Sequence, residues 1–102
     1  MRQDSDDELK MITVELPAAL GLHVNGKTKV VLDEPCKTVG DALAALGRRS
    51  PGLMDRVMDE RGNVRRHVNV FVNGESIRFL SGLDTPAPDG TTIFILAAIS
   101  GG

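Results

Sequence analysis

The sequence predicts a single α+β domain in which one amphipathic helix packs across one face of a mixed β-sheet. Several short segments alternate apolar and polar residues with the period of two that half-buried strands show. One segment, residues 38–48, instead carries apolar residues at helical spacing. A chain of 102 residues is long enough for one hydrophobic core, and a helix layered on a sheet is a stable way to build it.

Two strands are expected near the N-terminus. Residues 11–16 alternate apolar and polar side chains and predict a strand that Pro17 ends. Asn25 and Gly26 form a strong turn signal, and residues 27–33 predict the returning strand. The stretch AALGLHV between them is compatible with a long hairpin loop or with continuation of one strand.

The clearest helix is expected over Thr38–Arg48. Thr38, followed three residues later by Asp41, resembles a capping box, which satisfies main-chain N–H groups at a helix start. Leu43 and Leu46 are expected to be buried, because they belong to one apolar stripe made of Val39, Ala42, Leu43 and Leu46. Gly47, two arginines and Pro51 are typical of a helix end.

The second half of the chain predicts a helical turn, a loop and a hairpin. Leu53 and Val57 suggest a short second helical turn, and the charged residues 59–66 indicate an exposed loop. In HVNVFVNGESIRF, valines alternate, Asn-Gly turns, and Ile77 and Phe79 return as the second strand.

A loop over residues 81–90 leads to the last strand, TTIFILAAI, which is almost continuously apolar. Such a strand is usually covered on both faces or lies at the centre of its sheet. The expected order is therefore strand, strand, helix, strand, strand, strand. The domain is expected over residues 11–97, with a disordered polar extension at 1–10 and a flexible tail at 98–102.

Composition excludes several function classes. A net charge of −2, with no Trp, no Tyr and three Phe, offers neither a basic surface nor the usual base-stacking platform for nucleic acid. No apolar run reaches the roughly 18 residues of a membrane span, and the N-terminus lacks the apolar region of a signal peptide. We therefore expect a cytoplasmic protein that binds neither nucleic acid nor membrane.

Catalytic and metal sites are not expected either. Cys36 is the only cysteine, and His23 and His67 lie far apart without metal-ligand spacing or triad partners. Cys36 precedes the predicted helix start, where a thiol can be reactive, but a small half-buried residue is the favoured interpretation. The protein is thus predicted not to be an enzyme.

The chain ends on the unusual segment ILAAISGG, in which the apolar strand is followed by residues with almost no side chain. A frayed end is the simplest explanation. However, "VNVFVNGESI", then "DG", then "ILAAISGG" resembles the ubiquitin-like sulfur carrier family (ThiS/MoaD-like), which includes the thiamine-pathway carrier and the small subunit of molybdopterin synthase. The longer string over residues 65–102 is most similar to the sulfur carriers of the phosphoserine-dependent cysteine pathway. "DGT" and "AAISGG" depart from the family's usual "DGD" and from the Pro or Val that often precedes the glycines.

The resemblance implies a ubiquitin-like β-grasp fold and a specific chemistry. An E1-like enzyme would use ATP to adenylate the carboxylate of Gly102, and sulfur transfer would convert it to a thiocarboxylate. Ser100 and Gly101 would help to deliver this end into a narrow site, because glycine lacks a Cβ. The carrier would bind no cofactor itself. A PLP-dependent cysteine synthase would accept the sulfur, and a zinc metalloprotease is a further possible partner that trims the tail.

Three residues are candidates for docking to a partner enzyme. Ile99 lies beyond the predicted strand and is free for an apolar contact. Phe71 points opposite to its neighbouring valines and either lines an open sheet face or covers an edge of the core. Arg78 either pairs with an acidic partner or is simply solvated.

Other functions stay open at this point. A ubiquitin-like modifier conjugated to lysines would use the same activated glycine. The small subunit of a molybdopterin synthase would insert its tail into a larger subunit. A plain interaction domain with a chance Gly-Gly ending is a further alternative. The sulfur acceptor could lead to cysteine, thiamine, molybdopterin, a siderophore or another secondary metabolite.

Overall fold

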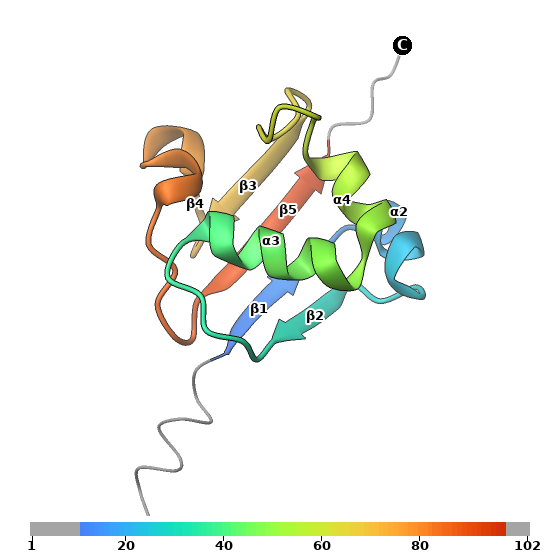
Figure 1. The fold of residues 1–102 in the computed structure, drawn as a ribbon, viewed down its shortest axis with the longest axis horizontal. Coiled ribbons are helices and arrows are strands. Elements are labelled where there is room, and N and C mark those ends of the chain that lie inside the picture. The colour runs from blue at the N-terminus through green and yellow to red at the C-terminus, as the bar shows by residue number, and fades with distance from the viewer. Residues whose placement is uncertain (1–10, 98–102) are drawn as a thin grey trace, which may run out of the picture.

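A five-stranded mixed sheet, in the order β2-β1-β5-β3-β4, forms the framework of the domain (Figure 1). The structure is a computed structural model and describes residues 11–97, so the expected N-terminal extension and C-terminal tail lie outside the described residues. The strands are β1 (Ile12–Glu15), β2 (Lys29–Leu32), β3 (Val68–Val72), β4 (Glu75–Ser76) and β5 (Thr92–Ala97). β1 and β5 pair in parallel at the centre, and the other neighbours pair antiparallel.

The main helix is α3 (Val39–Arg49), and its start follows the predicted capping box. The Thr38 hydroxyl accepts from the main-chain N–H of Asp41 at 3.1 Å, while the Asp41 carboxylate accepts from that of Thr38 at 3.2 Å. These bonds satisfy main-chain donors that a helix start otherwise leaves unpaired. Helix α4 (Pro51–Val57) follows directly, so the second helical segment is also confirmed.

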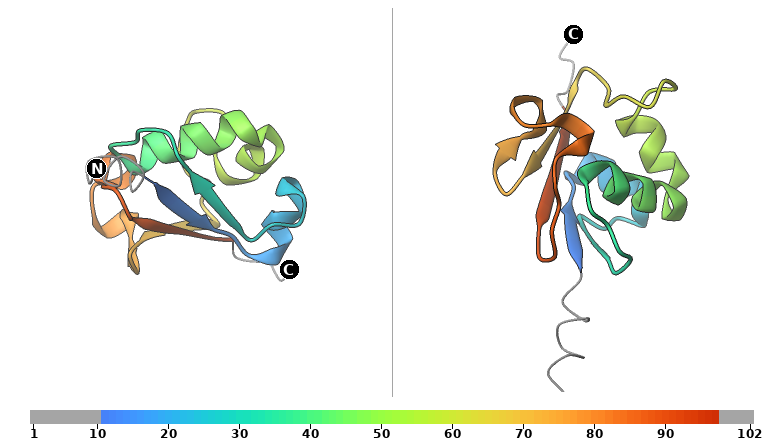
Figure 2. Two further views of the ribbon diagram at one scale, coloured as in Figure 1. Left: turned by 90° about the horizontal axis from the view of Figure 1, so that it is seen from below. Right: turned by 60° about the vertical axis from the view of Figure 1, so that its left-hand side comes forward.

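The core lies between the sheet and the two helices, which cover the same face (Figure 2). The expected burial of Leu43 and Leu46 is confirmed, because their side chains are almost fully shielded from solvent. From the sheet, the alternate residues that point toward α3 complete this core: Ile12, Val14, Leu32, Val68, Val70, Ile93 and Ile95. The single α+β domain with a helix across one sheet face is thus confirmed.

The connection between β1 and β2, which the sequence left open, is neither a long loop nor a continued strand. It contains a short helix, α2 (Ala18–Gly21), and a 3-10 turn, η1 (Leu22–Val24). Asn25 and Gly26 then turn the chain with φ angles of 58° and 78°. This confirms the turn that the Asn-Gly signal predicted.

The hairpin that follows β3 is shorter than predicted. Asn73 and Gly74 both have positive φ, as a tight hairpin turn requires, so the turn itself is confirmed. The prediction that Ile77 and Phe79 belong to the returning strand is wrong, because they lie in a 3-10 turn, η2 (Ile77–Phe79). The Ser76 hydroxyl accepts from the main-chain N–H of Arg78 at 3.2 Å and thereby favours the turn over further strand pairing.

A second 3-10 turn, η3 (Gly82–Asp84), interrupts the loop before β5. Strand β5 then occupies the centre of the sheet, as expected for so apolar a segment. Only one of its faces is covered, however. Ile93 and Ile95 are buried beneath the helices, whereas Phe94 and Leu96 on the opposite face are 41% and 44% exposed.

Candidate functional site on the open face of the sheet

The face of the sheet that no described helix covers carries an apolar patch. It consists of Phe71, Phe94 and Leu96, which we call the open-face patch. Phe71 in β3 lies directly opposite Phe94 in β5, and Asn69 lies opposite Leu96. Successive side chains of a strand point to opposite faces, so the alternation that buries Ile93 and Ile95 also turns Phe94 and Leu96 outward.

The open-face patch surrounds a shallow hollow of about 230 Å³, and Gly74 of the hairpin turn completes its lining. Gly74 has a φ of 93°, which an L-residue with a side chain rarely adopts, so the turn requires glycine. The exposed ring of Phe94 and the half-buried ring of Phe71 lie beside this hollow and offer an apolar contact to a partner, because aromatic side chains dominate interface cores.

The sequence left open whether Phe71 lines an open sheet face or covers an edge of the core, and in the structure it lies on the open face. Phe94 and Leu96 were missed as surface residues because the continuous apolar run of β5 suggests burial on both sides. The signal that could have identified them is their shared alternation with Phe71 across the β3–β5 pair.

The predicted tail residues lie outside the described residues, and they follow directly from the strand that carries the patch. Ile99, Ser100, Gly101 and Gly102 come after Ala97, the last residue of β5. Ala97 pairs with Val68, so this end of β5 lies beside the start of β3. The chain therefore leaves the domain next to Leu96, at one border of the open-face patch.

Arg78 does not join the open-face patch. Its guanidinium group donates to the main-chain carbonyls of Arg66 at 3.1 Å and Val68 at 2.9 Å. These bonds hold the start of β3 against η2. The side chain of Arg78 is thus already engaged with its own chain at the edge of the domain.

The environment of Cys36 favours packing over reactivity. The thiol is partly buried and packs against the core. Burial raises its pKa above the ordinary value, and the carboxylates of Asp41 and Glu34 raise the pKa further, while Arg48 opposes them. Because a raised pKa lowers the fraction of nucleophilic thiolate, the balance of these described surroundings disfavours a reactive Cys36.

The two histidines stay apart in the fold. His67 is exposed just before β3, whereas His23 lies beside the start of α4. Among residues 11–97, no three His, Cys, Asp or Glu side chains come together in a way that could hold a metal ion. Within the same range, no helix is both long enough and apolar enough to cross a membrane.

The chain resembles known proteins over nearly its whole length. The model of the ThiS family matches residues 15–102, which includes both terminal glycines. The sulfur carrier protein CysO of Mycobacterium tuberculosis is 36% identical over 93 residues, covering 89% of this chain and 98% of the relative.

Two solved structures extend the likeness to the fold. The Amycolatopsis orientalis BexX/CysO complex matches with a TM-score of 0.79 and 34% identity, over 89% of this chain and 99% of the matched chain. SAMP1 from Haloferax volcanii, a small archaeal modifier protein, matches with a TM-score of 0.77 and 32% identity. The match covers 90% of this chain and 99% of the matched chain. These likenesses confirm the ubiquitin-like β-grasp fold that the sequence predicts.

Proposed function

Because the chain belongs to the ThiS family, we propose that it is a sulfur carrier whose Gly102 carboxylate is adenylated and then converted to a thiocarboxylate. One observation carries this proposal: the family match runs through Gly102. It is supported by the M. tuberculosis relative of similar length, which is itself a sulfur carrier protein. The carrier is a protein co-substrate, and the catalytic groups belong to its partner enzymes.

The proposed chemistry has two steps. In the first, a carboxylate oxygen of Gly102 attacks the α-phosphorus of ATP, and pyrophosphate leaves. In the second, hydrosulfide attacks the carbonyl carbon, AMP leaves, and one proton is released. Adenylation is needed because a carboxylate is a poor electrophile until one of its oxygens becomes part of a good leaving group.

The fold suggests how the reacting group is delivered. We propose that the open-face patch docks on an E1-like activating enzyme, while residues 98–102 extend into its nucleotide site. Five extended residues span at most about 18 Å, which is enough to cross a narrow channel. Ser100 and Gly101 suit such a channel because they present little or no side chain. Ile99 adds an apolar contact at the channel mouth.

A partner that accepts the sulfur is also required. We propose a biosynthetic enzyme such as a PLP-dependent cysteine synthase, because the CysO protein of M. tuberculosis is 36% identical over 98% of its length. The A. orientalis relative forms a complex with BexX, which supports a carrier that acts on separate enzymes. A zinc metalloprotease that trims the tail is a further proposed partner. The ATP is bound by the activating enzyme.

A second candidate function is conjugation to lysines as a ubiquitin-like modifier. The likeness to SAMP1 and to small archaeal modifier protein 3, which is 37% identical over 65 residues, favours it as the alternative. Both functions use an activated Gly102. They differ in the acceptor, since a lysine conjugate contains an isopeptide bond that survives thiol reductants. The small subunit of a molybdopterin synthase remains a further alternative, for which a stable complex with a larger subunit would be the sign.

Mass spectrometry of the intact protein tests the proposal. With ATP, an E1-like enzyme and sulfide, the protein should gain the mass difference between sulfur and oxygen. Deletion of Gly102 withdraws the carboxylate by about 3.3 Å and should abolish the gain, since misplacement by about 1 Å already costs roughly 100-fold in rate. Gly101→Phe should act similarly by obstructing the channel.

Cys36→Ser is the matched control, and it should leave the mass gain unchanged. Loss of the gain in Cys36→Ser, together with its survival after deletion of Gly102, would instead show that the modification depends on the thiol and not on the Gly102 carboxylate. That result would overturn the proposal.

A further inference from the structure

Strand β2 forms one edge of the sheet and turns part of its main chain toward solvent. The main-chain N–H of Leu16 donates to Thr28 at 2.8 Å, which makes this opposite pair a hydrogen-bonded one. Because such pairs alternate along an antiparallel ladder, Val30 and Leu32 also face β1. The main-chain groups of Lys29 and Val31 must therefore point away from β1, toward the free edge.

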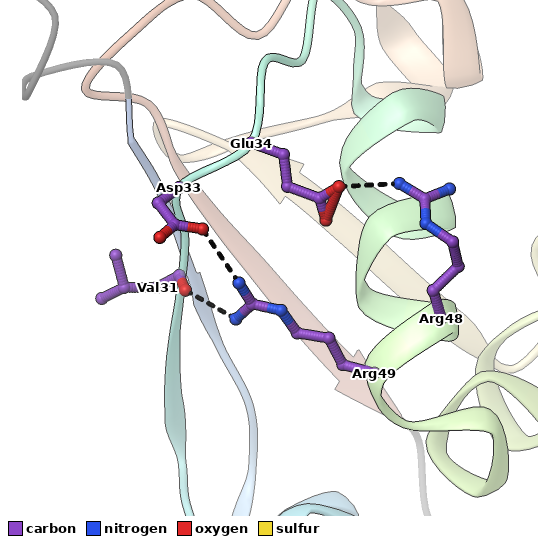
Figure 3. Close-up of polar contacts among 5 residues, drawn as sticks. All are labelled: Val31, Asp33, Glu34, Arg48 and Arg49. Atoms are coloured by element: carbon purple, nitrogen blue, oxygen red, sulfur yellow. Dashed lines mark hydrogen bonds and ion pairs between the residues drawn. The ribbon is translucent and has the colours of Figure 1, made fainter.

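A contact of Arg49 agrees with this direction (Figure 3). Its guanidinium group reaches across from the end of α3, donating to the main-chain oxygen of Val31 at 2.9 Å and to the Asp33 carboxylate at 3.1 Å. The Arg49 and Asp33 side chains are 41% and 77% exposed. Exposed ion pairs contribute little to stability, so Arg49 can leave this position at small cost.

A polar hollow of about 410 Å³ lies beside the same edge, on the helix side. Its lining includes His23, Lys27, Val30 and Arg49. Lys27 and Arg49 carry the charge of this lining, and Asp33 pairs with Arg49 at its border. The hollow itself is therefore basic, although the whole chain carries a net charge of −2. Such a local reversal of sign favours an acidic partner.

The opposite side of the β2 edge carries Val31 and also Lys29, which lies opposite Glu15 of β1. Val31 points to the open face and is 45% exposed, whereas its neighbour Val30 lines the basic hollow. A strand added beside β2 would thus place alternate side chains against Val31 and over the hollow. Apolar side chains fit the first position, and carboxylates fit the second.

We propose that the β2 edge binds an extended segment of a partner protein, in which apolar and acidic residues alternate, by adding it as a sixth strand. The added strand takes the main-chain hydrogen bonds of Lys29 and Val31, and Arg49 moves from the Val31 oxygen to an incoming carboxylate. In the free protein Arg49 occupies an acceptor of the edge and so protects it from unwanted pairing. The proposal does not depend on sulfur transfer.

Nuclear magnetic resonance titration of the labelled full chain tests the proposal, with an acetylated peptide of alternating valine and glutamate as the probe. The main-chain N–H signals of Lys29 and Val31 should shift most, and their exchange with solvent should slow. A matched peptide with lysine in place of glutamate should bind at least about tenfold more weakly at low salt, because the hollow is basic.

Val31→Pro is the decisive variant. It removes the outward N–H of Val31 without touching the β1–β2 ladder, and proline is tolerated on edge strands. Affinity for the acidic peptide should fall at least about tenfold, because the added strand loses a hydrogen bond and meets a ring. Val31→Thr, which keeps the N–H and the branched side chain, should bind like the natural protein. If Val31→Pro fails to fold, Lys27→Glu should weaken binding of the acidic peptide through charge, because Lys27 lines the hollow.

Four results would overturn the proposal. One is equal affinity for the acidic and basic peptides. The second is undiminished binding by a folded Val31→Pro variant, and the third is a set of signal shifts centred on Phe94 and Leu96 instead of β2. The fourth is a concentration-dependent dimer, formed without peptide and abolished by Val31→Pro, because it would assign the edge to a second copy of the chain. Deletion of Gly102 should leave peptide binding unchanged, which separates this test from that of the carrier function.

Discussion

Gly21 lets the chain turn between β1 and β2 at a point where a side chain has no room. A Cβ at this position would clash with the main-chain oxygen of Lys27, which cannot swing away as a flexible side chain would. The main-chain N–H of Gly26 also donates to the oxygen of Gly21 at 2.8 Å, so the two segments are held together. The absence of a side chain at Gly21 is therefore a packing requirement.

We expect Gly21→Ala to lower the free energy of unfolding by about 1–3 kcal/mol, as overpacking of a closely packed site does. Urea unfolding of the full chain measures this change. Gly52→Ala is the matched control, because the nearest atom to a new Cβ there is the His23 Nδ1 at an ordinary 3.8 Å. Gly52 lies in α4, where alanine is the better helix former, so the control should be neutral or slightly stabilising. Equal losses in both variants would contradict the steric argument.

The sequence alone predicts the structural role of Gly26 but not that of Gly21. Gly26 follows Asn25, and an Asn-Gly pair signals a turn by its own conformational preference. Gly21 is needed because of a contact with Lys27, which only the folded arrangement of the loop creates. The contacts of Arg78 could not be predicted for the same reason. Its carbonyl partners Arg66 and Val68 lie just before and at the start of β3.

Helix α3 was predictable because the forces that start it are local. The Thr38 hydroxyl and the Asp41 carboxylate bond to main-chain groups within four residues, so their spacing is visible in the sequence. The 3-10 turn η2 was not predictable in this way. The alternation that suggests a strand places Ile77 and Phe79 on one face, yet Ile77 is buried and Phe79 is 85% exposed. The turn η2 allows Ile77 to enter the core while Phe79 stays in solvent.

The start of α3 should make stability depend on pH through Asp41. The pKa of Asp41 is lowered in the folded chain, first by the main-chain N–H of Lys37, which donates to the carboxylate at 2.9 Å, and then by that of Thr38. The folded state thus binds this proton more weakly than the unfolded state does. The resulting stabilisation is present above the ordinary pKa of 3.8 and is lost as the pH falls through the lower folded value.

We therefore expect the stability advantage of the natural chain over Asp41→Asn to be full near neutral pH and to shrink once the pH falls below about 4. The asparagine side chain keeps an acceptor oxygen but does not titrate in this range. Chemical unfolding of both proteins at a series of pH values gives the difference directly. If the difference in unfolding free energy between the two proteins is the same at neutral and at strongly acidic pH, the charge of the Asp41 carboxylate does not contribute to stability.

At the scale of the whole molecule, helices cover one face of the sheet and leave the other face exposed to solvent. One face forms the core with α3 and α4, which lie on that side of the sheet (Figure 2). The other face exposes the open-face patch. The sequence of β5 does not distinguish these faces, because apolar side chains occupy both. Which face is covered depends on where the helices pack, and this is a property of the assembled domain. The position of β5 at the centre of the sheet could be predicted, but its open side could not.

Adjacent residues of β5 provide the sharpest test of this division. Ile95 is fully buried, so Ile95→Ser should lower the free energy of unfolding by about 3–5 kcal/mol through the cavity and the buried hydroxyl. Phe94 is 41% exposed on the opposite face, and Phe94→Ser should cost only about 1–2 kcal/mol, mainly from the lost contact with Phe71. Urea unfolding measures both values.

Phe94→Ser also tests the proposed docking of the open-face patch on the activating enzyme. Phe94→Ser should slow sulfur loading by the activating enzyme at least about tenfold, because aromatic anchors carry much of an interface's binding energy. Phe79→Ser removes an aromatic ring that is 85% exposed and does not line the hollow of the open-face patch, and this variant should load normally. The loading rate follows from the gain in intact mass over time, at a carrier concentration below saturation. Normal loading by Phe94→Ser, or equal slowing by Phe79→Ser, would exclude the open-face patch as the surface that the activating enzyme recognises.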